Sequence, residues 1–336
     1  MRAVGYTEAG PASVLGDVEL PDPTPGPRDL LVEVAAVSVN PVDTKVRTRG
    51  GSEDGTPKVL GYDAAGVVAA VGEQVEAFSV GDEVYYAGSI ARPGTNSELH
   101  LVDERIVGPK PSSLSMAEAA ALPLTAITAW ELLFDRLGVE QGGGEGRTLL
   151  VVGAAGGVGS ILVQLARQLT SLRVVGTASR PETQEWARDL GAHDVVDHSG
   201  DLAAAVRELG IDHVDLIAGL TATDDHWAAY ADLVAPQGRI GVIDDPADGL
   251  DVMGLKQKCA SLHWEFMFAR PVHQTPDMVE QHRLLAEVAR LVDDGRVRST
   301  LTETAGEITA ENVVRAHRML ESGSTRGKVV LAGWPA

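Results

Sequence analysis

The stretch Leu149–Leu165 reads LLVVGAAGGVGSILVQL and decides the fold class of the chain. It begins as an apolar run typical of a buried strand, passes through a glycine-rich turn and ends with helical spacing. Glycines in such a turn let the backbone approach a pyrophosphate, whose charge is stabilised at the helix N-terminus. The usual fingerprint is G-x-G-x-x-G, but Ala154 occupies its first glycine position here. The motif predicts a dinucleotide site, with a tight turn of some other α/β sheet as the alternative.

Strands and helices alternate around this motif, which is typical of a parallel sheet covered by helices. The predicted strands are Thr148–Gly153, Leu172–Ala178, Asp194–Asp197, His213–Ala218 and Arg239–Ile243. The predicted helices are Val158–Leu169, Pro181–Leu190, Asp201–Leu209 and Asp224–Val234. The candidate cofactor-binding residues of this region are Ala155, Gly156, Gly157, Val158, Gly159 and Ile243.

The end of the second of these strands bears on the choice of cofactor. NAD sites usually carry Asp or Glu about 20 residues after the glycines, where it bonds the ribose 2′-OH. Here the strand Leu172–Ala178 is followed by Ser179 and Arg180. No carboxylate stands there to repel a 2′-phosphate, and a guanidinium can pair with one. The sequence therefore favours NADPH, with Arg180 as a solvated loop charge in the alternative interpretation.

The two ends of the chain have a different pattern. Valine-rich runs broken by Gly and Pro predict strands at Leu30–Val39, Gly66–Val71 and Asp82–Tyr86. Helical spacing begins at Leu124–Leu137, and the tail holds predicted helices Asp277–Val292 and Ala310–Leu320 and a last strand, Lys328–Leu331. The first part therefore reads as a small, mostly β domain, to which the tail can return.

Composition excludes several classes of function. Asp and Glu outnumber Lys and Arg by 48 to 28, and the net charge of −20 would repel nucleic acid over most of the surface. No run of about 18 apolar residues is present, so no membrane span is expected. The N-terminus lacks a basic segment followed by an apolar one, so no signal peptide is expected either. The single cysteine, Cys259, allows no internal disulfide, and we expect a cytoplasmic protein.

Four stretches resemble one known family. They are Leu149–Arg167, Leu60–Gly72 (LGYDAAGVVAAVG), Val80–Tyr85 (VGDEVY) and Leu122–Leu133 (LPLTAITAWELL). Together they resemble quinone reductases and related zinc-independent members of the medium-chain dehydrogenase/reductase superfamily, over nearly the whole length. The resemblance implies an α/β fold with a GroES-like β domain, residues 1–123 completed by 270–336, and a Rossmann NADP-binding domain, residues 124–269. It also implies a homodimer that pairs the outer strands of the cofactor domains, with Leu262–Phe268 at that edge.

Two further stretches, Asn40–Asp43 and Ser261–Phe268, resemble a subgroup often labelled zinc-binding alcohol dehydrogenase-like. In zinc-dependent relatives a catalytic cysteine occupies the position of Asn40, and a histidine precedes a glutamate where Tyr62 and Asp63 stand. A lobe with four structural cysteines is also typical of them. This chain has none of the three features, and the spacing of its nine histidines fits no metal motif. We therefore expect no bound metal.

The missing metal bears on the chemistry. An alcohol then lacks the Lewis acid that stabilises its alkoxide, whereas a quinone or conjugated enone accepts hydride directly. Asn40 and Tyr62 are the catalytic candidates, because an amide and a phenol can each stabilise a developing oxyanion. In the alternative interpretation, Asn40 is a turn residue before Pro41 and Tyr62 is a packing residue. Two further candidates are Thr125 and Thr128, which we expect beside the nicotinamide, with helix caps as the alternative. Phe266 and Phe268 are candidates for an apolar wall of the substrate cleft, with core residues as the alternative.

The sequence therefore predicts NADPH-dependent reduction of a small-molecule quinone or enone by direct hydride transfer. An NADPH-binding protein without enzymatic activity, such as a sensor, is one alternative. An alcohol or aldehyde oxidoreductase of the same superfamily is the other. No interaction with nucleic acid or with membranes is expected.

Overall fold

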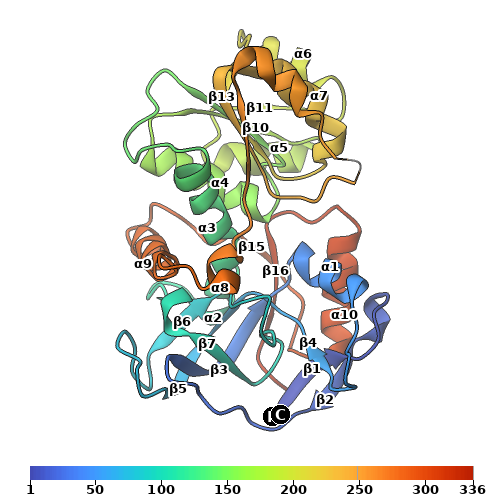
Figure 1. Cartoon of the computed structure of the whole chain (residues 1–336), viewed down its shortest axis with the longest axis vertical. Coiled ribbons are helices and arrows are strands. Elements are labelled where there is room, and N and C mark those ends of the chain that lie inside the picture. Colours follow the sequence, from blue (N-terminus) through green and yellow to red (C-terminus); the bar gives the residue numbers. More distant parts are fainter. Residues whose placement is uncertain (248, 336) are drawn as a thin grey trace. The chain divides into compact units, whose positions relative to one another are not determined.

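The structure is a computed structural model that describes residues 1–247 and 249–335. The chain divides into two compact units, one formed by Met1–Ile127 with Phe268–Ala336 and the other by Thr128–Met267. Both ends of the chain therefore belong to the first unit, where Figure 1 shows blue N-terminal and red C-terminal segments together. The domain boundaries predicted from the sequence differ from these by a few residues at each junction.

The second unit is built on one parallel sheet, whose described strands have the order β11-β10-β9-β12-β13-β14. The strands are β9 (Thr148–Val152), β10 (Arg173–Thr177), β11 (Asp194–Val196), β12 (Val214–Gly219), β13 (Val234–Val242) and β14 (Ser261–Trp264). The helices are α4 (Gly157–Leu169), α5 (Pro181–Asp189), α6 (Leu202–Arg207), α7 (Thr223–Leu233) and the 3-10 segment η4 (Val252–Lys258). This doubly wound sheet confirms the predicted Rossmann architecture.

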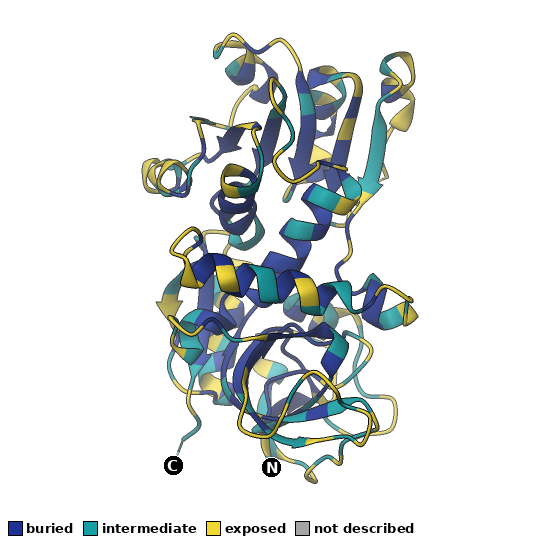
Figure 2. Ribbon diagram, turned by 90° about the vertical axis from the view of Figure 1, so that its left-hand side faces the viewer, coloured by how far each residue is buried: buried dark blue, intermediate teal, exposed yellow. Residues whose placement is uncertain are grey.

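The strand order identifies the ligand-binding edge of this sheet. β9 lies between β10 and β12, and the chain winds outward from it in both directions. Ligands of such sheets bind beyond the carboxyl ends of the strands at this switch point. Leu149–Val152 of β9 is fully buried, as expected of a parallel strand with both faces covered, and Figure 2 shows the sheet's inner strands in the dark blue of buried residues. The glycine turn that follows β9 therefore stands at the ligand-binding edge.

One strand of this sheet begins earlier than the sequence predicted. β13 starts at Val234, whereas the predicted strand was Arg239–Ile243. Gln237 has a φ of 63°, and the pairing of β13 with β12 shifts register between Val214 and Leu216. Because of this irregularity, the first part of β13 lacks the regular alternation of apolar residues that predicts a strand.

The first unit contains two sheets among the residues that the structure describes. The smaller has the order β2-β1-β4, and the larger runs β15-β16-β3-β5-β6-β8 with β7 also paired to β3. The strands are β1 (Arg2–Tyr6), β2 (Gly16–Glu19), β3 (Asp29–Ser38), β4 (Lys58–Val59), β5 (Ala64–Val71), β6 (Glu83–Tyr86), β7 (Leu99–Asp103), β8 (Val107–Pro109), β15 (Leu301–Thr304) and β16 (Lys328–Ala332). β16 pairs antiparallel with β3, so that Val330 lies beside Ser38. The end of the chain thus completes a sheet that the N-terminal part begins.

The first unit also contains helices. They are η1 (Ala12–Val14), α1 (Pro41–Arg49), η2 (Glu104–Ile106), α2 (Met116–Ala120), α8 (Ala269–His273), α9 (Glu280–Asp293) and α10 (Ala310–Glu321). One of these helices, α1, was not predicted from the sequence. It begins with Pro41, directly after its N-cap, Asn40. The backbone N–H of Asn40 donates to Asp43 Oδ2 at 2.7 Å. The side chain of Asp43, in the first turn, thus caps the N-terminus of the helix.

A long helical segment leads from one unit of the chain to the other. α3 (Pro123–Trp130) continues as the π-helical η3 (Glu131–Arg136), which agrees with the predicted helix Leu124–Leu137. Together with α2, the segment Met116–Arg136 is long and apolar enough to cross a membrane by length and composition. However, 78% of its apolar window is buried inside the protein, which is the condition of a core helix.

Candidate active site

The glycine turn after β9 is fixed by its own backbone and by β10. Gly153 has a φ of 86°, which residues with a side chain rarely adopt. Its N–H donates to Thr177 Oγ1 at 3.1 Å, and the N–H of Ala154 donates to the Thr177 carbonyl at 3.1 Å. A Cβ at Gly159 would lie 2.2 Å from the Gly153 carbonyl oxygen. Only glycine at position 159 therefore lets α4 pass so close to the turn.

Half of the predicted cofactor-binding residues lie at the start of α4. Ala155 precedes the N-cap, Gly156, and Gly157–Gly159 form the first turn. The first amides of an α-helix have no acceptor within the helix and attract anions. Ile243 directly follows β13, and its N–H donates to the Gly219 carbonyl at 3.3 Å at the end of β12. These residues share the carboxyl edge of the sheet, and this edge has the chemistry to hold the phosphates of a dinucleotide.

Ser179 and Arg180 follow β10 at the same edge. Ser179 is exposed, and Arg180 is the N-cap of α5. The Arg180 side chain is 43% exposed, and its Nε lies 3.3 Å from Glu182 Oε1. A 2′-phosphate at this position would therefore compete with Glu182 for the guanidinium.

His198 also belongs to this edge, although it was not among the predicted site residues. It follows β11, and its Nδ1 lies 2.7 Å from Thr177 Oγ1, the same hydroxyl that accepts the N–H of Gly153. His226 packs edge-on against it, with ring centroids 5.7 Å apart. Burial, followed by the charge of His226, lowers the pKa of His198. The His198 imidazole next to the glycine turn is therefore neutral. In the sequence, the only signal for this residue was its position after the third strand.

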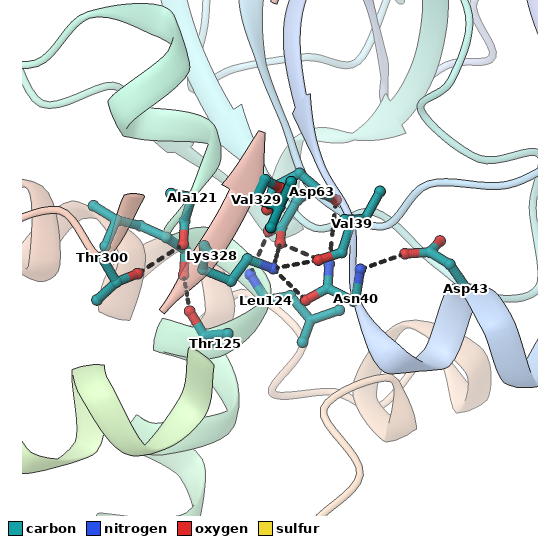
Figure 3. Close-up of polar contacts among 12 residues, drawn as sticks. Val39, Asn40, Asp43, Asp63, Ala121, Leu124, Thr125, Thr300, Lys328 and Val329 are labelled. Atoms are coloured by element: carbon teal, nitrogen blue, oxygen red, sulfur yellow. Dashed lines mark hydrogen bonds and ion pairs between the residues drawn. The ribbon is translucent and has the colours of Figure 1, made fainter. Parts of the chain in front are cut away.

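In the first unit, a buried polar cluster surrounds Lys328 (Figure 3). β16 begins at this residue, whose side chain is 4% exposed. Its Nζ donates to Asp63 Oδ2 at 2.9 Å, to the Val39 carbonyl at 3.1 Å and to Asn40 Oδ1. Asp63 Oδ1 in turn accepts the N–H of Leu124 at 2.7 Å. One ammonium and one carboxylate thus join β16 to the end of β3 and to the starts of α1 and α3.

The prediction that Asn40 donates to a substrate oxygen does not fit these contacts. Its Oδ1 faces the Nζ of Lys328, which can only donate. Its Nδ2 therefore points the other way and donates to Asp63 Oδ2 at 2.8 Å, with the Ser38 carbonyl at 3.4 Å. Asn40 is 1% exposed, so its amide is committed inside the protein and supports the structure instead.

Tyr62 retains an available donor. It lies in the turn before β5, it is 3% exposed, and its ring packs edge-on against Phe268 with centroids 5.3 Å apart. Its hydroxyl forms no hydrogen bond with any residue that the structure describes. Burial, followed by the charges of Asp43 and Tyr6, raises the pKa of Tyr62 far above its usual value. The phenol therefore stays protonated at neutral pH and can donate to an oxyanion.

Asp43 holds the turn that carries this tyrosine. The carboxylate is fully buried, and its Oδ2 accepts the N–H of Asn40 while its Oδ1 accepts the N–H of Gly61 at 2.9 Å. Burial raises the pKa of Asp43 to about 7, although the two N–H groups and Lys328 act against this rise. Asp43 thus fixes Gly61, the residue before Tyr62, and Asp63 is the residue after Tyr62.

Thr125 and Thr128 both lie in α3 and are buried, at 2% and 5% exposure. The hydroxyl of Thr125 donates to the Leu122 carbonyl at 3.0 Å. This bond matches the alternative in which Thr125 supports the start of the helix.

The two phenylalanines differ from what the sequence suggested. β14 ends at Trp264, so Phe266 and Phe268 lie beyond the end of this strand. Phe268 is 2% exposed and contacts Tyr62, whereas Phe266, in the other unit, is 50% exposed. Phe268 is thus placed against a catalytic candidate.

The donor set around Lys328 does not suit a zinc ion. Zinc sites combine thiolate, imidazole and carboxylate ligands. The positions that the resemblance assigns to zinc ligands carry an amide, a phenol and a carboxylate, and the Lys328 ammonium already bonds the amide and carboxylate oxygens. Within residues 1–247 and 249–335, no group of three or more His, Cys, Asp or Glu side chains is placed to hold a metal.

Comparison with protein families gives two matches. Residues 26–123 match the alcohol dehydrogenase GroES-like domain, and residues 190–331 match the zinc-binding dehydrogenase family. A zinc-type alcohol dehydrogenase-like protein of Staphylococcus aureus is 42% identical over 311 residues, which cover 92% of each chain.

Solved structures resemble the chain along its whole length. A crystal structure from Rhizobium etli, named as a zinc-dependent alcohol dehydrogenase protein, is 57% identical with a TM-score of 0.96 and covers 100% of this chain and 99% of its own. The Escherichia coli quinone oxidoreductase in complex with NADPH is 25% identical with a TM-score of 0.85, over 99% of this chain and 100% of its own.

Proposed function

Because the chain belongs to the medium-chain dehydrogenase/reductase superfamily, in its zinc-type alcohol dehydrogenase-like family, we propose that it reduces quinones or conjugated enones with NADPH and without a metal ion. The observation that carries the proposal is Tyr62, a buried phenol whose hydroxyl has no partner among the described residues. A donor of this kind serves a reaction in which negative charge collects on an oxygen atom.

The chemistry follows from the residues available. A bound nicotinamide cofactor supplies the hydride. Tyr62 donates a hydrogen bond to the oxygen of the acceptor, which stabilises the enolate or quinol anion as charge develops. Phe268 supports the phenol ring with an edge-on contact. A quinone or enone needs no more help than orientation, a dry site and one such donor.

Alcohol oxidation makes a different demand. It needs a group that removes the hydroxyl proton, and a metal ion is the usual means of lowering the pKa of that proton. The ammonium of Lys328 directs its donors to Asp63, Val39 and Asn40. The cluster therefore offers no group to activate an alcohol, which supports reduction of activated acceptors as the preferred chemistry.

For the cofactor, we propose NADPH. The first-turn amides of α4 would hold the pyrophosphate, and the guanidinium of Arg180 would pair with the 2′-phosphate. Ser179 adds a hydroxyl at the same edge. The absence of a carboxylate at the end of β10 supports this choice over NAD.

We also propose a cytoplasmic homodimer. β14 pairs with β13 along one side, and β14 is the last strand of the described sheet. Trp264 is 54% exposed and Phe266 is 50% exposed at or just beyond this edge. An open strand edge beside exposed aromatics favours pairing with a second copy of the chain. Light scattering that finds a monomer at micromolar concentration would overturn this assembly.

One experiment separates the candidate activities. Purified protein is screened for NADPH oxidation with quinones, enones, aldehydes and ketones, with and without a chelator, and for NADP⁺ reduction with simple alcohols. We expect turnover of quinones or enones that the chelator leaves unchanged. Chelator-sensitive turnover of alcohols or aldehydes would establish the alternative oxidoreductase, and NADPH binding without any turnover would establish a binding protein.

A further inference from the structure

The number of donors on Lys328 equals the number of acceptors around it. An ammonium carries three N–H donors. The oxygens of Val39, Asn40 and Asp63 accept from it, at 3.1 Å for the Val39 carbonyl and 2.9 Å for Asp63 Oδ2. The Lys328 side chain is 4% exposed and that of Asp63 is 0% exposed. Every proton on Nζ therefore has a partner inside the protein, and none remains for a substrate.

We infer that Lys328 is a built-in cation that takes the place of a metal ion and positions Tyr62 for catalysis. The residue acts through Asn40 and Asp63, which occupy the metal-ligand positions of zinc-dependent relatives, and touches no substrate itself. The inference rests on the proposed function, in which Tyr62 donates to the acceptor oxygen.

Asp63 transmits the effect of the ammonium to the tyrosine beside it. Its Oδ2 accepts from Lys328 and from Asn40 Nδ2, and its Oδ1 accepts the N–H of Leu124 (Figure 3). All these contacts hold the backbone directly after Tyr62. A carboxylate this deeply buried needs a compensating charge, and Lys328 is the cation within bonding distance of it.

The residue before Tyr62 is held as firmly. Gly61 has a φ of 107°, and its N–H donates to Asp43 Oδ1 at 2.9 Å. A Cβ at this position would lie 2.6 Å from Thr95 Oγ1. Tyr62 therefore stands between two anchored neighbours, and the position of its hydroxyl depends on both anchors.

The test compares full-length Lys328→Ala with the wild type, with and without added propylammonium chloride. We expect kcat for a quinone to fall by about tenfold or more, because a small displacement of a catalytic group costs rate. The Kd of NADPH should not change. Propylammonium should restore kcat with saturation, while 1-propanol, a neutral molecule of the same size, should not. An unaltered kcat, or equal rescue by propanol, would overturn the inference.

A second variant covers the possibility that an unpaired Asp63 prevents folding. Lys328→Met combined with Asp63→Asn removes both charges of the pair, so neither partner is left as an unpaired ion. We expect this protein to fold, as judged by circular dichroism and NADPH binding, and to retain the low kcat. Wild-type kcat in the folded double variant would show that the ion pair does not position Tyr62.

The matched control is Lys110→Met. Lys110 is another lysine with a 4% exposed side chain, and it bonds the carbonyls of Pro111 and Leu114 and pairs with Glu83. It contributes to the fold, and we expect its loss to leave kcat unchanged. A fall in kcat equal to that of Lys328→Ala would mean that any buried lysine gives the effect.

A readout without turnover separates this inference from the proposed function. In ¹⁵N-labelled protein, a buried ammonium exchanges its protons slowly and gives a side-chain signal. We expect such a signal in the wild type and its loss in Lys328→Met. If no quinone or enone is reduced but the signal is present, the proposed function fails and the built-in cation stands; without the signal, the built-in cation itself is wrong.

Discussion

The Nζ atom of Lys328 lies 2.9 Å from Oδ2 of Asp63, although the two residues are 265 positions apart in the chain. Both side chains are buried, at 4% and 0% exposure. Removing one partner of a buried ion pair leaves the other charge without compensation. The pair therefore ties the end of the chain to the turn that carries Tyr62.

Lys328→Met should lower the free energy of unfolding of the first unit by about 3–5 kcal/mol, because it leaves a buried carboxylate unpaired. Urea unfolding followed by circular dichroism measures the change. The same substitution at Lys110 should cost much less, since its partner Glu83 is 55% exposed and remains hydrated. Equal losses for the two variants would argue against an uncompensated charge at Asp63.

Asp43 should make stability depend on pH in an unusual direction. Its pKa in the folded protein is about 7, above the ordinary value of 3.8, so the folded state binds its proton more tightly. The stability that this proton contributes is complete below about pH 3.8 and is lost as pH rises through about 7. The difference in unfolding free energy between wild type and Asp43→Asn should therefore shrink over that range, by at most about 1.4 kcal/mol for each pH unit. A difference that grows with pH would contradict the assignment.

Gly159→Ala should impair both folding and cofactor binding. The new Cβ would lie 2.2 Å from the Gly153 carbonyl oxygen, and overpacking of this kind costs about 1–3 kcal/mol. Gly156→Ala is the matched control, because a Cβ there would lie 3.5 Å from the same oxygen, an ordinary contact. Thermal unfolding of both variants, together with NADPH fluorescence titration of Gly159→Ala, checks this. Equal stability of the two variants would show that α4 adjusts its start.

Arg180→Ala should weaken NADPH binding and leave NADH binding nearly unchanged. Loss of a charge-assisted contact to phosphate costs roughly 1.5–3 kcal/mol, or about ten- to a hundred-fold in affinity. Glu182→Gln should have the opposite effect, since Glu182 lies 3.3 Å from the Arg180 Nε and competes for it.

The control for this pair is Arg173→Ala. Arg173 has the same 43% side-chain exposure, lies in β10 and pairs with Asp194. Its loss removes the same charge from the same unit, so it should affect both cofactors little and equally. Equal weakening of NADPH and NADH by Arg180→Ala would show that Arg180 does not recognise the 2′-phosphate.

Local patterns were sufficient to predict the cofactor edge of the fold. The glycine turn, the alternation of strands and helices and the residues Gly156–Gly159 all depend on neighbours within a few positions. The early start of β13 was not predictable, because Gln237 adopts a positive φ without being glycine.

The polar cluster of the first unit depends on contacts between distant parts of the chain. A lysine at the start of the apolar strand Lys328–Ala332 was visible, but its partners are fixed only when β16 pairs with β3. In the folded protein the side-chain amide of Asn40 bonds Asp63 and Lys328, whereas the sequence predicted that it would donate to a substrate oxygen. Of the two catalytic candidates, the cluster leaves Tyr62 with an available hydroxyl.

The kcat of Tyr62→Phe for a quinone, measured on chelator-treated protein, tests the chemistry most directly. Removing one preorganised donor to an oxyanion costs about 2.7–4 kcal/mol, or about 10²- to 10³-fold in kcat. We predict a loss of this size with an unchanged Kd for NADPH, and full activity of the chelator-treated wild type. A Tyr62→Phe protein with wild-type kcat, or a wild type that loses its activity to the chelator, would contradict metal-free reduction with Tyr62 as the donor.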